Sequence, residues 1–227
     1  MKQPALWTCC LVALLASGCA EKMQVPSWLP WGHHSQDLSG IPSPTERVEN
    51  LRKLAKDAAK TPPAQKLQVS QELSHEIQRQ DDPLIRAEIV RTLAEYPGPA
   101  TDQVLRAAVK DPDADVRLAA CDTWAKRGDS EAAKQMAGLL AGDIDRDVRF
   151  AAARALAHTH DQAAITALAA VLEDGDPAMQ YQAVLSLREI THLDLGNDVN
   201  RWREYNKSGK LQPGDPPSLA ERMRRTF

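Results

Sequence analysis

The feature that most constrains the fold is an internal repeat with a period of 31 or 32 residues. In each repeat, apolar residues stand at one position and again 4, 5 and 8 residues later; in the first repeat these are Ile85, Ile89, Val90 and Leu93. Residues with this spacing lie along one side of an α-helix. We therefore predict one helix in each repeat, called helix A below. The four repeat starts are Asp82–Arg86, Asp113–Arg117, Asp145–Arg149 and Asp176–Gln180.

A second apolar stripe follows each helix A after a short break. Its aligned positions are Leu105, Met136 and Leu168, and then Val109, Leu140 and Leu172. This stripe predicts a second helix, helix B, so that each repeat is a helical hairpin. One hairpin cannot bury its apolar stripe alone, and neighbouring hairpins therefore stack. The predicted fold is all-α, a short α-solenoid of stacked helical hairpins.

The composition agrees with helices that pack through small side chains. Aromatic residues make up only 4% of the chain, while apolar residues, at 43%, suffice for a core. Alternating runs rich in Val, Ile, Thr and Tyr, which would predict strands, are missing. The formal net charge is −3, so no basic excess favours nucleic acid as a partner.

The hairpin period and the Asp-x-x-Val-Arg start of helix A resemble the HEAT-like repeats of the bacterial phycobilisome-lyase (PBS lyase) type. The resemblance covers about residues 82–190. It implies that Arg86, Arg117 and Arg149 each pair with an acidic side chain of a neighbouring hairpin and form a ladder. Gln180 replaces the arginine in the last repeat, so the ladder is expected to end there.

Residues 1–18 have the layout of a secretory signal peptide, with Lys2 followed by an apolar stretch that is too short to span a membrane. The residues that follow, Leu15-Ala16-Ser17-Gly18-Cys19, resemble a bacterial lipobox, although Ala16 stands where leucine is usual. The resemblance implies cleavage before Cys19 and lipidation of its thiol. An ordinary signal peptide cleaved near Ala16 or Ala20 is the alternative.

Lipid chains on Cys19 would anchor the protein stably in a membrane of the cell envelope. By resemblance to enterobacterial lipoprotein sorting, Ala20, which is not aspartate, implies the outer membrane, with the domain on its periplasmic or surface face. The predicted segments are a lipoprotein signal peptide (1–18), a lipid-anchored flexible tether (19–44), a divergent N-terminal hairpin (45–80), HEAT-like repeats (81–192), and a C-terminal cap and tail (193–227).

Motifs for catalysis or cofactor binding are absent from the sequence. There is no Gly-x-Ser-x-Gly elbow, no Gly-x-Gly-x-x-Gly motif and no Walker A loop. His75-Glu76 is the only His-Glu pair, and one imidazole with one carboxylate does not complete a metal site. Cys121 and Trp124 fall on the core stripe of helix A, where a buried, inert thiol is expected. We predict no cofactor and no metal.

Acidic clusters precede each helix A, and two of them begin like a calcium-binding EF-hand loop. Both lack the glycine and the glutamate that such a loop needs at its sixth and twelfth positions. Their phase matches the repeat, so a carboxylate that caps the helix N-terminus explains them better. The predicted capping residues are Asp82, Asp113, Asp145 and Asp176.

The predicted function is a protein-binding scaffold or adaptor in the cell envelope, because a solenoid offers a groove and the chain offers no catalytic constellation. Its expected partner is an envelope protein. The alternatives are a PBS-lyase-like or metal-dependent enzyme on the same fold, and a structural protein that packs against itself. Helix B lines the inner face of HEAT-like solenoids, so its non-core positions supply the candidate protein-binding residues, which are Gln103, Arg106, Lys134 and Thr166. Arg106 is the best single anchor.

Overall fold

The computed structural model describes residues 42–214. Ten α-helices and one short 3-10 helix, but no strand, lie in this part of the chain, which confirms the all-α prediction. None of its helices combines the length and the apolar character that crossing a membrane requires. The predicted signal peptide, Cys19 and most of the predicted tether lie outside the described residues, as does the tail from 215 onward.

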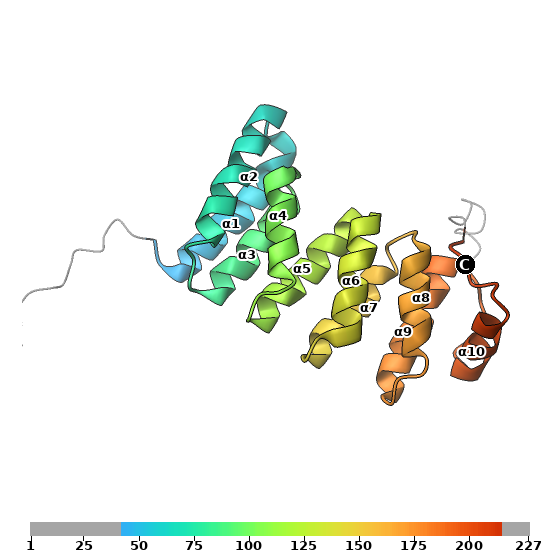
Figure 1. Ribbon diagram of the computed structural model, residues 1–227. Coiled ribbons are helices and arrows are strands. Elements are labelled where there is room, and N and C mark those ends of the chain that lie inside the picture. The colour runs from blue at the N-terminus through green and yellow to red at the C-terminus, as the bar shows by residue number, and fades with distance from the viewer. Residues whose placement is uncertain (1–41, 215–227) are drawn as a thin grey trace, which may run out of the picture. The chain divides into compact units, whose positions relative to one another are not determined.

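Helices A and B alternate along the chain and form two layers. Neighbouring A helices pack side by side throughout, and in the B layer α2 packs on α4 and α6 on α8 (Figure 1). The A helices are α1 (Pro44–Asp57), α3 (Pro83–Leu93), α5 (Ala114–Arg127), α7 (Arg146–Leu156) and α9 (Pro177–Thr191). The B helices are α2 (Pro63–Ile77), α4 (Pro99–Ala108), α6 (Ser130–Gly142) and α8 (Gln162–Val171). The predicted solenoid of hairpins is therefore confirmed.

The B layer is less continuous than the A layer. Helix α4 packs on α2 and on α5, whereas its contact with α6 is slight at most. Helix α6 in turn packs mainly on α7, the A helix of the next repeat. The exposed side of the B layer is therefore interrupted between α4 and α6, while the A layer holds the repeats together.

Aspartate caps explain where the A helices begin. The side chains of Asp82, Asp113, Asp145 and Asp176 each accept a hydrogen bond from a backbone N–H two residues further on, as predicted. The first hairpin uses other means. Ser43 and Glu46 form a reciprocal capping box at α1. Because proline suits the first helical position, α1 begins at Pro44, one residue ahead of the predicted start of the hairpin at 45.

The predicted stripes form the core. Trp124 is fully buried, and the guanidinium of Arg127 stacks over its ring with 4.9 Å between the guanidinium carbon and the ring centroid. Cys121 is also buried, and this burial raises the pKa of its thiol to about 12. The thiolate needed for reactivity is therefore scarce at neutral pH. Both residues have the core role predicted from the repeat register.

A short helix covers the C-terminal side of the last repeat. Helix α10 (Val199–Lys207) packs on α8 and α9, and the indole of Trp202 is fully buried there. The indole N–H donates a hydrogen bond to the Gly196 carbonyl at 2.9 Å. The Arg203 guanidinium donates to the Leu172 carbonyl at the end of α8, at 3.0 Å. The Arg203 bond links α10 to the last repeat, whereas the Trp202 bond joins α10 to the loop that precedes it.

Candidate protein-binding surface

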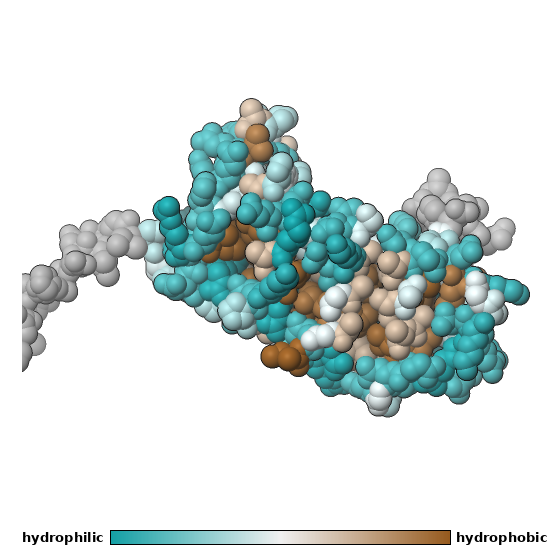
Figure 2. Space-filling view, viewed as in Figure 1, coloured by the Kyte–Doolittle hydropathy of each residue, from teal (hydrophilic) through white to brown (hydrophobic). Residues whose placement is uncertain are grey.

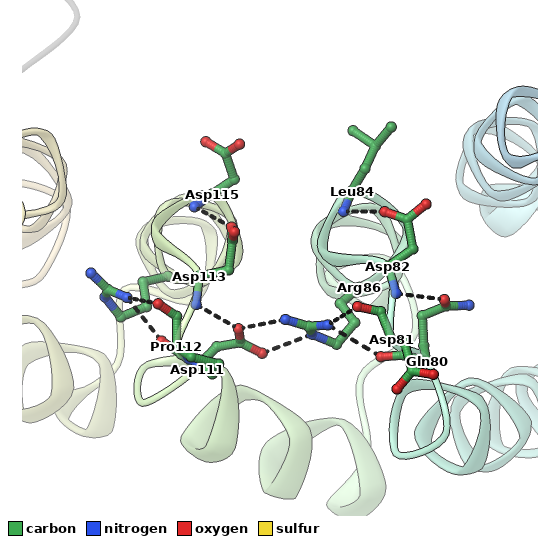
Figure 3. A network of polar contacts seen from close by, with 10 residues as sticks. Gln80, Asp81, Asp82, Leu84, Arg86, Asp111, Pro112, Asp113 and Asp115 are labelled. Carbon is green, nitrogen blue, oxygen red and sulfur yellow. Dashed lines mark hydrogen bonds and ion pairs between the residues drawn. The ribbon is translucent and has the colours of Figure 1, made fainter.

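Ion pairs join the loops that lead into consecutive A helices. Arg86 of α3 donates two hydrogen bonds, at 2.9 and 2.8 Å, to the carboxylate of Asp111 in the loop before α5 (Figure 3). Its third nitrogen donates to the carbonyls of Gln80 and Asp81 in the loop before its own helix. Such bidentate, charge-assisted bonds are the strong kind, so each arginine joins two successive loops.

The next pair repeats this geometry. Arg117 donates to both oxygens of Asp143 at 2.8 and 3.0 Å. Burial disfavours the ionised form of this carboxylate, but hydrogen bonds from Arg117 and from the Asp145 amide outweigh burial and lower the pKa of Asp143. The pKa of Asp111 is lowered for the corresponding reasons. Both carboxylates therefore stay ionised at neutral pH and hold their arginines.

The ladder weakens toward the C-terminus. The closest nitrogen–oxygen distance between Arg149 and Asp174 is 3.7 Å, and both side chains are more exposed than those of the earlier pairs. In the last repeat Gln180 donates to the backbone carbonyl of Asp174 instead of reaching a carboxylate ahead. The ladder implied by the sequence is thus present, and it ends at Gln180.

The four candidate residues all lie exposed on B helices. Gln103 and Arg106 are on α4, Lys134 is on α6 and Thr166 is on α8. Within residues 42–214, neither Arg106 nor Lys134 forms an ion pair. The structure places the four along one layer and does not gather them into a single pocket.

A groove of about 210 Å³ lies between α2 and α4, and Gln103 is one of its lining residues. Its walls are mostly apolar, with Ile77 from α2 and Val104 and Ala107 from α4. The ion pair of Arg86 and Asp111 also lines it, so the first rung of the ladder borders this groove.

A second groove, of about 320 Å³, lies between α8 and α10, and Thr166 lines it. Ile165 and Ala169 contribute apolar surface from α8. The α10 side contributes Arg203, which is held by the Leu172 carbonyl and lies 3.3 Å from a carboxylate oxygen of Glu173. The two grooves therefore lie at α4 and at α8, with α6 between them in the chain.

Small side chains cover much of the layer between the grooves. In the space-filling view, apolar residues gather over α6 and α8, whereas polar residues dominate over α2 and α10 (Figure 2). The exposed residues of α6 include Gly138 and Ala141, which have no long side chain that would block access to this surface.

Sequence reasoning missed the walls that α2 and α10 contribute. Ile77 and Gln78 line the first groove, and Asn206 and Lys207 line the second. Neither helix follows the repeat register, so no alignment of repeats could assign these residues to a groove. The glycine- and proline-rich sequence around α10 indicated a cap but not which helix the cap faces.

His75 and Glu76 lie near Arg47 and Glu72 in an open pocket at the end of α2. The Glu76 carboxylate pairs with Arg47, so it is engaged by a side chain of the same hairpin. In the part of the chain that the structure describes, no three His, Cys, Asp or Glu side chains are grouped as metal ligands would be.

The stacked hairpins and the ladder define an α-solenoid of the armadillo-like class. HEAT repeats match residues 70–157 and 139–198, which is more than half of the chain, and the protein therefore belongs to the HEAT-repeat family. No curated protein matches the chain. The crystal structure of an engineered protein from a structural genomics consortium is similar, with 22% sequence identity over 77% of this chain and 95% of that chain, and a TM-score of 0.47.

Proposed function

We propose that this protein is a non-enzymatic scaffold of the cell envelope, anchored by lipid, that binds another protein through the exposed face of its B helices. One observation carries the proposal. The four candidate residues lie exposed along that layer, and two of them line separate grooves in it. Exposed side chains beside apolar grooves are what a protein partner can contact without unfolding the core.

The chemistry of this face favours protein over other ligands. A polyanion would need a continuous stripe of arginine or lysine, but the last repeat has Thr166 on α8 and Glu173 just after this helix. Stacked aromatic side chains, which hold bases or sugars, are missing from the lining of both grooves. A surface of small apolar groups with scattered charges suits a modest protein contact.

The test reverses two exposed charges on this face. A photoreactive residue in place of Gln103 captures the partner in intact cells. The variant Arg106→Glu with Lys134→Glu should give less of this crosslinked product. The matched control is Lys53→Glu with Arg154→Glu, which makes the same charge change at exposed positions of A helices. Circular dichroism should show both variants folded. Undiminished crosslinking in the folded Arg106/Lys134 variant would contradict a binding site on the B face.

The anchor is proposed from the sequence alone, because Cys19 lies outside the described residues. Cys19→Ser removes the thiol that accepts lipid. The variant should leave the detergent phase in a phase-partitioning experiment, or remain there only with its signal peptide uncleaved. Full partitioning of a processed Cys19→Ser chain would show that lipid on this residue is not the anchor. Fractionation of the wild-type protein then tests the proposed outer-membrane location.

A further inference from the structure

The sequence that follows the described part of the chain predicts one more short helix. Ser218 and Glu221 stand three residues apart, which is the spacing of a capping box at a helix N-terminus. Leu219, Met223 and Phe227 then recur every four residues, and residues with this spacing lie along one side of a helix. The residues between them include three arginines, so the predicted helix has one apolar and one basic side.

A helix of this length needs a surface that covers its apolar side. Isolated helices shorter than about 12–15 residues are marginal in water, because few backbone hydrogen bonds offset the cost of nucleation. A helix over 219–227 is about 14 Å long, and α8, with ten residues, has nearly the same length. The predicted helix is therefore expected to be stable where its apolar side packs along another helix.

The described part of the chain ends beside the groove between α8 and α10. The Leu211 carbonyl accepts a hydrogen bond, at 3.2 Å, from the side chain of Gln162, which lines this groove. The N–H of Gly214 donates to a carbonyl in the last turn of α9 at 3.0 Å. Only residues 215–217 separate Gly214 from the N-cap of the predicted helix, and a chain of this length spans about 14 Å at most.

The groove between α2 and α4 is out of reach. Along the B layer, α6 and α8 stand between α4 and α10 (Figure 1). Packed helices lie about 8–10 Å apart, so the distance from α10 to α4 is on the order of 25 Å or more. The three linking residues cannot span this distance, and the predicted helix therefore cannot lie along that groove. Of the two grooves, the position of the chain selects the one at α10.

The lining of the α8–α10 groove suits the apolar side of this helix. Ile165, Ala169 and Leu172 contribute apolar surface, and Thr166 and Ala170 are exposed at its edge. Leucine, methionine and phenylalanine side chains that enter the groove are removed from water together with this lining, which favours binding.

Helix α10 runs antiparallel to α8 along the groove. Arg203 of α10 donates to a carbonyl at the C-terminal end of α8, whereas Leu211, beyond the end of α10, is bonded to Gln162 at the N-terminal end of α8. Lys207 therefore lies nearer the end at which the chain would enter the groove, and Glu173 lies at the far end.

The charges of the predicted helix match this polarity. Its first turn carries Glu221, and its last turn carries Arg224 and Arg225. A helix that enters at the N-terminal end of α8 and follows α8 brings these arginines toward Glu173, whose side chain is 66% exposed, and keeps them away from Lys207. Charge complementarity therefore favours this direction over the reverse.

We propose that residues 218–227 bind the α8–α10 groove of the same chain as an amphipathic helix. The apolar side of this helix covers the groove, including Thr166, and closes the B face at its C-terminal end. The short link keeps the effective concentration high, so a modest contact suffices to hold the helix in place. The contact forms whether or not the rest of the B face binds another protein.

Photo-crosslinking within the purified full chain tests this contact. A benzophenone side chain in place of Met223, on the apolar side of the helix, should crosslink to residues of α8 or α10, which mass spectrometry identifies. The matched control places the same side chain at Arg225, on the basic side, and should give about tenfold less of these products.

Variants of the groove and of the helix provide the second comparison, with the benzophenone kept at position 223. Ala170→Trp fills the groove from an exposed position and should lower the yield about tenfold, whereas Ala107→Trp, at an exposed alanine of the other groove, should leave it within about twofold. Thermal melts show whether both variants fold. Leu219→Glu with Phe227→Glu lies outside the repeats, so it should lower the yield without affecting their folding.

Three results would overturn the inference. Crosslinks from position 223 that join two chains would show that the helix binds a second copy. Irradiation with vesicles of phosphatidylglycerol and phosphatidylcholine supplies the second: crosslinks to lipid that replace those to α8 and α10 would assign the helix to the membrane surface. Equal yields from positions 223 and 225 would exclude an ordered contact. None of these results involves partner capture from Gln103, so the scaffold role is tested separately.

Discussion

Each repeat contains two kinds of loop, one that leads into helix A and one that leads out of it. The loops leading in share one construction. The carboxylate of an aspartate such as Asp111 or Asp143 accepts a hydrogen bond from the backbone N–H two residues further on. The same carboxylate also pairs with the arginine of the preceding helix A. The loops leading out differ from one another. In the loop after α3, the Tyr96 hydroxyl donates a hydrogen bond to the Leu54 carbonyl. In the loop after α5, Gly128 ends the helix with a left-handed backbone conformation.

This difference shows how the two edges of the solenoid are stabilised. The loops leading in depend on charge-assisted bonds that recur with the repeat (Figure 3). The loops leading out depend on packing and on local backbone geometry, for which each repeat has its own solution. Substitutions at the two edges should therefore differ in size and in sensitivity to pH, and this can be tested.

The largest effect is expected at the end of α5, beside a loop that leads out. Trp124→Ala removes a fully buried indole, and lost burial together with the cavity should destabilise the domain by about 3–5 kcal/mol. That is a large fraction of the stability of a typical domain. Thermal melts provide the measurement. A shift in Tm of less than about one degree would place Trp124 outside the core and contradict the repeat register.

The next largest effect is expected at a loop that leads in. Arg117→Ala leaves the carboxylate of Asp143, whose side chain is 4% exposed, without its cation, and should cost about 3 kcal/mol. Urea unfolding gives the value. In the control, Arg117→Met with Asp143→Asn removes both charges while the amide can still accept the Asp145 N–H, so it should cost less. An equal loss in both variants would mean that the charge itself is unimportant here.

The ladder also predicts how stability depends on pH. In the folded state the pKa values of Asp111 and Asp143 lie below their usual range, which is about 3.9 for an unfolded aspartate. Their contribution is therefore complete above about pH 4 and is lost as the pH falls from there through the folded pKa values. Urea unfolding between pH 7 and pH 3 should show this loss. Arg117→Ala should flatten the curve, and a slope unchanged from wild type would assign the acid sensitivity to other carboxylates.

The same difference between loops explains what the sequence could predict. The loops that lead in repeat with the period, so the caps could be predicted from spacing, whereas the arginine ladder and its end at Gln180 were implied by the resemblance to HEAT-like repeats. The exposed positions of α4, α6 and α8 followed from the same register. The grooves did not, because each needs a wall from α2 or α10, whose sequences lie outside the periodic pattern. The spacing of residues within the repeats cannot show how a helix outside the repeat pattern packs against them.

A substitution at Gly128 tests whether backbone conformation and steric fit stabilise the loops that lead out. Gly128 has φ of +61°, and an added Cβ would lie 2.7 Å from the carbonyl oxygen of His158. Gly128→Ala should therefore destabilise the domain by about 2 kcal/mol, and the loss should not change with pH. Gly138→Ala is the matched control, since its Cβ would meet nothing within 4 Å inside α6 and should stabilise slightly. Equal melting curves for both variants would contradict the steric account.

The smallest effect is expected where the ladder ends. Arg149 and Asp174 are 3.7 Å apart with side chains 30% and 27% exposed, so solvent screens their interaction. Arg149→Ala should cost only about 0.5 kcal/mol, close to the usual value for a surface ion pair. Urea midpoints of Arg149→Ala and Arg117→Ala, measured side by side, decide the point. If the two losses are equal, burial does not set the strength of a rung. If Arg149→Ala hardly changes the urea midpoint, the stabilising ion pairs of the ladder are its buried ones, and the last repeat depends instead on the packing of α10.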